Sequence, residues 1–354
     1  YGSIITNDSR YLIFKIRPLF KDTRDARIKK KRLDEMPKDS MAIIELGKDD
    51  VWKTARVKTF KTPEKGNGWL AYHLDKALPE APKPAPKPDS LTQINKMMSM
   101  ADSLLRVADS LKNKANEAKT KGLSALQAPK RETRPNNRPA ADPVEEGTEL
   151  VVRNMQTGEE KKFALVSEYY FSEQGNVLLI ETTRKNADTL SKATVYWMNT
   201  ATGKIDTVLK GFNDAKNYAM DEAGTKLAFV AERDSASKSL KKFYKLYHYK
   251  NGMDSARLRA DRNTAGVKSG LTISPDYINR FSKNGNRLFF GLALIRQPKD
   301  TTLVEFETAK LDIWHYDDLD LQPQQLVQAG AELRRSYVAV LNGCLLYTSD
   351  AADE

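Results

Sequence analysis

The chain has 354 residues, of which 40% are hydrophobic and 30% are charged, and its formal net charge is +11. This length can bury a large core, the composition is typical of a soluble protein, and no apolar run approaches the roughly 18 residues of a membrane span. Cys344 is the only cysteine, so the sequence predicts neither disulfides nor a cysteine-based zinc site.

A turn followed by an apolar run occurs five times along the chain. In each copy, Asn, Asp, Ser or Gly residues that favour tight turns precede a run typical of a buried strand. The copies are Asn7–Phe14, Gly66–Tyr72, Ser172–Ile180, Asp221–Phe229 and Ser282–Phe290. Their turn residues Ser9, Gly66, Gly175, Gly224 and Gly285 are separated by 57, 109, 49 and 61 residues. This period predicts the repeated four-stranded blade of a β-propeller.

The longest interval contains an insertion of 68 residues, 79–146, and its removal leaves 41 residues, close to the length of one blade. Nine of the 15 prolines lie between Pro79 and Pro143, and no aromatic residue occurs between His73 and Phe163. A segment of this composition cannot build a packed core of its own. We therefore expect blades in 1–78 and in 147–343.

The insertion itself has two parts. Pro79–Pro88 predicts an extended, polyproline-like spacer. Residues 91–111 predict a helix with one apolar stripe, formed by Leu91, Ile94, Met98, Ala101, Leu105 and Ala108 at alternating steps of three and four. The stripe could dock a partner or a membrane surface, but we favour packing on the propeller or on a second copy of the chain.

Three further segments predict hairpins in the outer part of the blades. A β-branched and aromatic run leads into a turn ending in Gly in Val151–Glu159, Thr194–Lys204 and Tyr247–Gly252. The predicted fold is all-β, a partial β-propeller of about five blades of four-stranded antiparallel sheet with a Pro-rich and helical insertion. An ordinary sandwich of unrelated hairpins is the weaker alternative. An open propeller exposes strand edges, so we expect poor solubility of the chain alone.

Both ends of the chain are unusual. The first residue is Tyr1, without an initiator Met or a leader, and Ile4 and Ile5 run directly into the first turn. We expect a fragment with a truncated amino terminus and a signal peptide lost upstream. At the other end, residues 344–354 resemble a translated sequencing-library adapter, a tail that recurs in metagenomic predictions. We expect this tail to be an artefact that takes no part in the fold.

The basic run Lys29–Arg32 raises the question of nucleic-acid binding. Acidic residues are interleaved around it, including Asp22, Asp25 and Asp34, and no stacking aromatic residues accompany it. We therefore interpret the run as a solvated loop and predict no nucleic-acid partner.

The sequence nominates no catalytic, cofactor-binding or metal-ligating residue, and it predicts no cofactor. His73, His248 and His315 lie in strand-like contexts, and strand alternation would send Asp312 and His315 to opposite faces. There is no His-Glu-x-x-His spacing, no Gly-x-Ser-x-Gly elbow, no P-loop and no dinucleotide fingerprint. The motif Gly66-Asn67-Gly68 is explained as a turn.

Several segments resemble the amino-terminal propeller of prolyl oligopeptidase family (S9) serine peptidases from Bacteroidota. These segments are residues 22–31, 36–46 and 61–72. Residues 311–318 and 322–326 are similar to a later blade of the same family.

The resemblance implies a periplasmic or secreted serine peptidase whose propeller gates access for short peptides. In that family, a carboxy-terminal α/β-hydrolase domain supplies the Ser, Asp and His of the triad. That domain is absent from these residues, so no catalytic role can be assigned. Glu145–Glu146 and Glu159–Glu160 lack the aromatic context of the family's glutamate pair, and no role is transferred to them. The alternative is a non-catalytic propeller, similar to TolB or WD40-like modules, that binds protein or glycan.

Overall fold

The computed structural model describes residues 2–77, 97–106, 108–109, 112, 143–188, 190–236, 239–298, 313, 315–342 and 345–348. The chain divides into two compact units, Tyr1–Ala77 with Ala141–Glu354, and Leu78–Ala140. In the second unit, residues 97–106 are helical and exposed, as the apolar stripe of 91–111 predicts for its central part. The predicted polyproline spacer lies outside the described residues. No helix in the described part is both long and apolar enough to cross a membrane.

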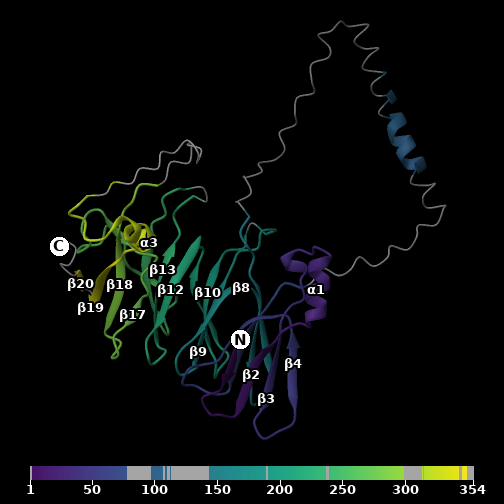
Figure 1. Ribbon diagram of the computed structural model, residues 1–354, viewed down its shortest axis with the longest axis horizontal. Helices are drawn as coiled ribbons and strands as arrows, with labels where there is room; N and C mark the ends of the chain where they lie inside the picture. Colours follow the sequence, from purple (N-terminus) through teal and green to yellow (C-terminus); the bar gives the residue numbers. More distant parts are fainter. Residues whose placement is uncertain are drawn as a thin grey trace. The chain divides into compact units, whose positions relative to one another are not determined.

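The first unit is built from antiparallel strands that form five blades (Figure 1). Blade 1 consists of β1 (Ser3–Ile5), β2 (Tyr11–Ile16), β3 (Ser40–Glu45) and β4 (Val51–Ala55). Blade 2 consists of β5 (Val57–Lys61), β6 (Trp69–Leu74), β7 (Thr148–Asn154) and the first half of β8 (Glu160–Phe171). Blade 3 consists of the second half of β8, β9 (Val177–Thr182), β10 (Thr194–Asn199) and β11 (Ile205–Lys210).

The last two blades follow the same strand order. Blade 4 consists of β12 (Asp214–Met220), β13 (Lys226–Glu232), β14 (Lys245–Lys250) and β15 (Arg257–Ala260). In blade 5 the first strand is interrupted, so that β16 (Leu271–Ile273) and β17 (Arg280–Phe281) both pair with β18 (Arg287–Leu294). The blade is completed by β19 (Tyr337–Asn342) and β20 (Leu345–Thr348). Leu345–Thr348, part of the tail that we expected to lie outside the fold, thus pair with β19.

Strand β8 joins two blades without a loop. Up to Phe163 it pairs with β7, and from Glu168 it pairs with β9. Val166, between them, pairs with both Thr148 of β7 and Thr182 of β9, and each ladder has a break in register beside it. Leu165 has a φ of 59°, in the left-handed region, which turns the strand between its two partners. The outermost strand of blade 2 therefore continues directly as the innermost strand of blade 3.

The core lies between consecutive blades. Because side chains alternate along a strand, each second strand sends one set of side chains to the preceding blade and the other to the following blade. In β13, Leu227 and Phe229 pack toward blade 3, whereas Ala228 and Val230 pack toward blade 5. Four such apolar clusters join the five blades in sequence.

The five predicted turns are confirmed as the connections between the first and second strands of the five blades, and the three predicted hairpins connect third and fourth strands. The predicted fold class is confirmed as well. Among the described strands, none pairs blade 1 with blade 5, so the propeller is open.

One local expectation was wrong, because His315 lies in an exposed turn and not in a strand. Residues 322–326, which resemble part of a later blade, begin the helix α3 (Gln322–Glu332) between β18 and β19 of blade 5. A Pro at the start of α3 and the Gln324 side chain, which accepts from the backbone N–H of Leu321, favour this helix.

The turns between first and second strands repeat one hydrogen-bond pattern in four blades. A side-chain oxygen accepts a bond from the backbone N–H five residues later, in the pairs Thr6 and Tyr11, Ser172 and Val177, Asp221 and Lys226, and Ser282 and Arg287. The residue three positions after this acceptor has a positive φ, and it is Ser9, Gly175, Gly224 or Gly285. The turn residues therefore recur because the same backbone shape recurs.

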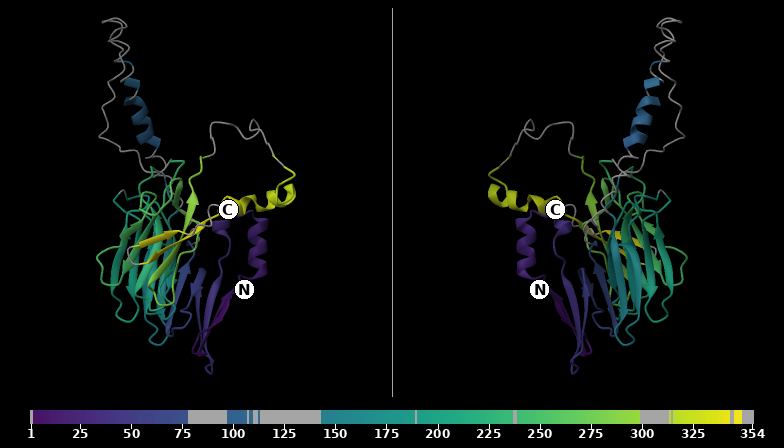
Figure 2. Two further views of the ribbon diagram at one scale, coloured as in Figure 1. Left: turned by 90° about the vertical axis from the view of Figure 1, so that its left-hand side faces the viewer. Right: turned by 90° about the vertical axis from the view of Figure 1, so that its right-hand side faces the viewer.

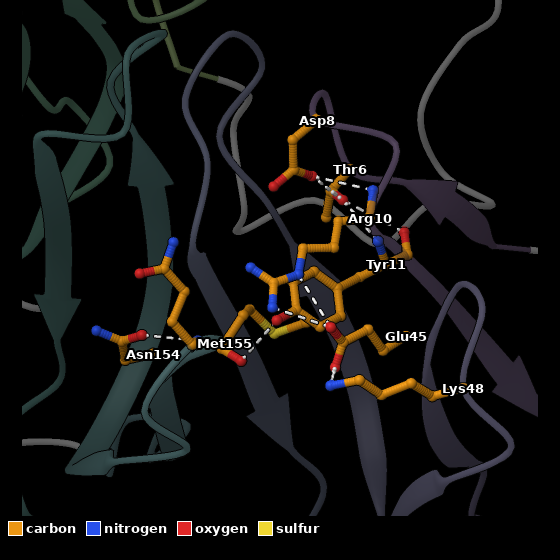
Figure 3. A network of polar contacts seen from close by, with 9 residues as sticks. Thr6, Asp8, Arg10, Tyr11, Glu45, Lys48, Asn154 and Met155 are labelled. Carbon is orange, nitrogen blue, oxygen red and sulfur yellow. Dashed lines mark hydrogen bonds and ion pairs between the residues drawn. The ribbon is translucent and has the colours of Figure 1, made fainter.

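Consecutive turns also contact one another. The bonds between blades run from Asn7 to Lys65, from Lys65 to Glu173, from Asn176 to Ala223 and from Lys226 to Gly285, at 2.6 to 3.1 Å. Figure 3 shows the neighbouring network at blade 1, where Arg10 and Lys48 share Glu45, and the Tyr11 hydroxyl donates to the Met155 carbonyl of blade 2 at 3.1 Å. We call the side formed by these turns the turn face.

Candidate functional site

The opposite side of the propeller carries the long connections between second and third strands, and we call it the loop face. The connections span residues 17–39, 75–147, 183–193, 233–244 and 295–336. Residues 78–140 within the second interval form the other compact unit, which is described separately. The connections differ in length and sequence, and two of them contain the helices α1 (Phe20–Ile28) and α3. Variable loops on a rigid scaffold are where binding sites occur most often.

A cavity of about 620 Å³ opens between blades 3 and 4 on the loop face. We call it the Glu181 pocket, and its lining is Pro143, Val144, Glu145, Glu181, Thr182, Thr183, Arg184, Ala193, Phe212, Asn213, Asp214, Glu232, Ala236 and Lys242. Four of these residues are acidic and two are basic. The pocket has the size of a site for a small organic molecule or a short peptide segment.

Glu181 is held by the innermost strands of both blades. It lies near the end of β9, and its two carboxylate oxygens accept hydrogen bonds from the Tyr218 hydroxyl of β12, at 2.7 Å, and from the Ser167 hydroxyl of β8, at 3.0 Å. Tyr218 in turn stacks on Phe229, with ring centroids 5.3 Å apart. The carboxylate is therefore fixed by two partners and is not a freely rotating surface group.

Two glutamates of the pocket have opposite electrostatic environments. Burial raises the pKa of Glu181 to about 7, and Asp214 and Glu168 add to this, while the Tyr218 and Ser167 hydrogen bonds oppose it. Burial acts in the same direction on Glu232, but hydrogen bonds from Asn213 and Ser235 prevail and hold its pKa below the ordinary value. At neutral pH, Glu232 is ionised and Glu181 is partly protonated, so Glu181 is the group of this pair that can respond to a ligand.

Aromatic and cationic side chains of neighbouring inner strands lie beside this carboxylate. Tyr170 contacts the Tyr218 ring at 5.6 Å between centroids, and the Lys61 ammonium lies 4.3 Å from the centroid of Tyr170. Lys61 also donates to the Tyr169 carbonyl at 2.7 Å, and burial lowers its pKa. The innermost strands β5, β8 and β12 thus present a connected polar and aromatic surface.

The hydroxyl and imidazole groups closest to a catalytic arrangement are His73 and Thr148, and their bonding is structural. His73 Nε2 lies 2.8 Å from Thr148 Oγ1, but this hydroxyl donates its proton to the Leu74 carbonyl. The proton of the Thr148 hydroxyl is therefore engaged by a backbone carbonyl, and the pair is not arranged as a nucleophile and its base. Burial lowers the pKa of His73, which keeps the ring neutral.

The other two histidines lie apart from the pocket. His248 is in β14, and burial lowers its pKa, while His315 is exposed and packs on Tyr316 with ring centroids 4.3 Å apart. Within the described residues, no group of three His, Cys, Asp or Glu side chains is placed to hold a metal ion.

Sequence reasoning did not single out Glu181, Tyr218 or Ser167. Glu181 directly follows the apolar run Val177–Ile180, and a charged residue in this position usually indicates that a buried strand has reached the surface. The one usable signal was that this carboxylate continues a fully buried run. Glu145, which we did consider, lines the Glu181 pocket, whereas Glu160 binds Arg153 and Tyr72 within blade 2.

No protein-family model matches the chain, and neither does any curated protein. Among solved structures, it is similar to the β-propeller domain of the trilobed protease from Pyrococcus furiosus, with 9% identity, a TM-score of 0.38, and coverage of 89% of this chain and 65% of that one. It is also similar to the Pyrococcus horikoshii acylaminoacyl peptidase, with 8% identity, a TM-score of 0.40, and coverage of 98% of this chain and 39% of that one. A third similar structure is TolB from Acinetobacter baumannii, with 10% identity, a TM-score of 0.32, and coverage of 96% of this chain and 52% of that one. The chain thus spans less than two thirds of the length of each, and likenesses this low carry no argument about function.

Proposed function

We propose that this chain is the substrate-gating propeller of a serine peptidase of the prolyl oligopeptidase type, which acts on short peptides in the periplasm or outside the cell. The catalytic α/β-hydrolase domain belongs to another part of the full-length protein. The resemblance of residues 22–31, 36–46 and 61–72 to that family supports the proposal. The observation that carries it is the Glu181 pocket, which lies between two blades on the face where the variable loops gather.

In this proposal, Glu181 binds the ammonium group of a peptide amino terminus. A free α-amino group has a pKa of about 8, and Glu181 has a pKa of about 7. The fraction of molecules in which both groups are charged is therefore largest between about pH 7 and pH 8. The bound ammonium replaces the proton that Glu181 otherwise takes up, because either one neutralises the buried carboxylate. Asp214 and Glu232 keep the pocket acidic and favour a cationic end over a carboxylate end.

Calorimetric titration with tetra-alanine and N-acetyl-tetra-alanine tests this assignment. We expect tetra-alanine to bind best near pH 7.5 and its acetylated form to bind at least about tenfold more weakly, because acetylation removes a charge-assisted hydrogen bond. Glu181→Gln should abolish the difference between the two peptides. The matched control is Glu222→Gln, an exposed carboxylate on the turn face, which should leave both affinities unchanged. Equal binding of both peptides by the wild type would contradict the assignment.

Catalysis is tested separately. A fluorophosphonate probe should label no serine of this chain, and a labelled serine would show that the chain carries its own nucleophile. Reading the source DNA past the codon for Gly343 should reveal further blades and then a Gly-x-Ser-x-Gly motif, followed by Asp and His. A stop codon soon after a closing blade would instead favour a non-catalytic, TolB-like binding module.

A further inference from the structure

Helix α1 presents one side to the blades and the other to solvent. Ala26 is buried and Thr23 and Asp25 are half-buried, so these residues mark the side that packs on the propeller. Both views of Figure 2 show the helix at the margin of the blades, with one side facing no strand. This outward side has no partner among the described residues.

Charge is segregated between the two sides of α1. At about 100° per residue, one half of the helix circumference holds Arg27, Phe20, Arg24, Ile28 and Lys21. The other half holds Asp25, Asp22, Ala26 and Thr23. The outward half therefore combines cations with large apolar side chains and contains no acidic residue.

The chain that follows α1 extends this surface. We define the α1 surface as the outward half of α1 together with Leu19 and the segment Lys29–Leu33. Its four large apolar side chains are all solvent-exposed, with fractions of 72% for Leu19, 81% for Phe20, 63% for Ile28 and 90% for Leu33. Four apolar side chains so exposed in one short segment indicate an interaction site.

The cations of the α1 surface have no ion-pair partner in the part of the chain that the structure describes. None of its seven basic side chains forms an ion pair with a described residue, and they are Lys21, Arg24, Arg27, Lys29, Lys30, Lys31 and Arg32. Nearby Lys38, by contrast, is paired with Asp75 at 3.2 Å. Seven cations that have no ion-pair partner among the described residues, around four exposed apolar side chains, match a partner that is anionic at its surface and apolar beneath it.

We propose that the α1 surface binds the surface of a bilayer that contains anionic lipids. Phe20 and Ile28 are separated by eight residues, or about 12 Å along the helix, so both can enter the interface when α1 lies flat on it. The long Lys and Arg side chains can extend past them and reach the phosphates. Apolar contact and electrostatic attraction act together here, which is the combination that reversible membrane binding requires.

A nucleic acid or another polyanion would satisfy the cations but not the apolar side chains. Phe20 and Leu33 are the most exposed large residues of this surface, and contact with a polyanion would leave them in water. The bilayer is therefore the occupant that the whole surface favours. This inference is independent of the peptide-binding role of the Glu181 pocket.

Co-sedimentation of the full chain with lipid vesicles tests the proposal. We expect the wild type to pellet with vesicles of phosphatidylcholine and phosphatidylglycerol and to remain in solution with phosphatidylcholine alone. Raised salt should weaken the binding. The triple variant Lys29→Glu, Lys30→Glu, Lys31→Glu should lower the partition coefficient by more than about tenfold, since each cation near an anionic surface contributes about fivefold.

Matched variants distinguish binding through the α1 surface from effects of the net charge and of exposed apolar residues elsewhere on the chain. Lys210→Glu, Lys250→Glu, Lys283→Glu changes the net charge by the same amount at exposed sites elsewhere and should keep most of the binding. Phe20→Ser with Leu33→Ser should reduce binding about tenfold or more. The control for that pair is Leu240→Ser with Ile278→Ser, which replaces exposed apolar residues in other blades.

Three results would overturn the proposal. The wild type could fail to pellet with anionic vesicles, or the two charge-reversal variants could lose binding equally. The apolar pair could also leave binding unchanged while heparin competes fully, which would identify a polyanion as the partner. Circular dichroism of each variant shows whether it is folded, so a loss of binding can be assigned to the surface.

Discussion

The turn face and the loop face of this propeller differ in how strongly their connections repeat from blade to blade. On the turn face, five short connections bond to one another, and four of them repeat one backbone shape. On the loop face, the connections differ in length and sequence, and they surround an acidic pocket and an exposed basic helix. The comparison shows how one fold separates the residues that hold its blades together from those that are free to acquire a function.

The largest expected effect comes from forcing two turns apart. A Cβ atom at Gly66 would lie 2.0 Å from the Gln174 carbonyl oxygen, which is backbone of the next blade and cannot rotate away. Gly66→Ala should lower the free energy of unfolding by about 3 kcal/mol or more, measured by urea denaturation. Gly330→Ala is the control, since its Cβ would meet nothing within 4 Å and the helix should gain slightly. A Gly66→Ala protein of wild-type stability would mean that the turns do not interlock.

The second prediction concerns the side-chain acceptor of the repeated turn, whose contribution to the free energy of unfolding should increase with its burial. Asp221 is 6% exposed and accepts from the backbone N–H groups of Thr225, at 2.6 Å, and Lys226, at 2.7 Å. Asp221→Ala should cost about 2 to 3 kcal/mol, because both donors lose their partner in a buried site. Ser282 is the equivalent residue in a more exposed turn, and Ser282→Ala should cost about 1 kcal/mol or less. Equal losses in the two variants would contradict the dependence on burial.

The contrast between the faces also explains what the sequence could predict. The turns were found because Gly175, Gly224 and Gly285 satisfy a local backbone requirement that is visible within a few residues. The Glu181 site was missed because its main partner, Tyr218, lies 37 residues away and in another blade. His315 was expected in a strand because loop-face segments follow no repeat against which they could be compared. Turn conformations can be predicted from a few neighbouring residues of one sequence. Contacts between blades cannot, because they depend on how all the blades pack together.

A third prediction uses the buried carboxylate of the loop face. The folded-state pKa of Glu181, about 7, lies above its ordinary value of 4.5, so the folded chain binds a proton between these pH values that the unfolded chain has released. The free energy of unfolding should therefore fall as the pH rises through this window. Glu181→Gln removes this contribution, and its stability relative to the wild type should increase by about 2 kcal/mol from pH 4.5 to pH 8, after discounting for partial exposure. A constant difference between the two proteins across this range would show that Glu181 titrates normally.

The smallest effect concerns the one repeated turn that carries a side chain where the other three have glycine. Ser9 has a φ of 53° at the position where Gly175, Gly224 and Gly285 have 72°, 64° and 66°. A side chain in this left-handed region is strained, so Ser9→Gly should stabilise the protein, by about 0.5 to 1 kcal/mol once the greater freedom of glycine in the unfolded chain is included. The reverse exchange, Gly285→Ser, should destabilise by a similar amount, since its Cβ would meet the flexible end of Lys226 at 3.4 Å and Asp221 only at ordinary contact distances of 3.6 and 3.7 Å. Opposite signs for these exchanges in thermal melts would show that the turns are one motif with interchangeable residues, whereas a loss in both would mean that Ser9 is fitted to blade 1 alone.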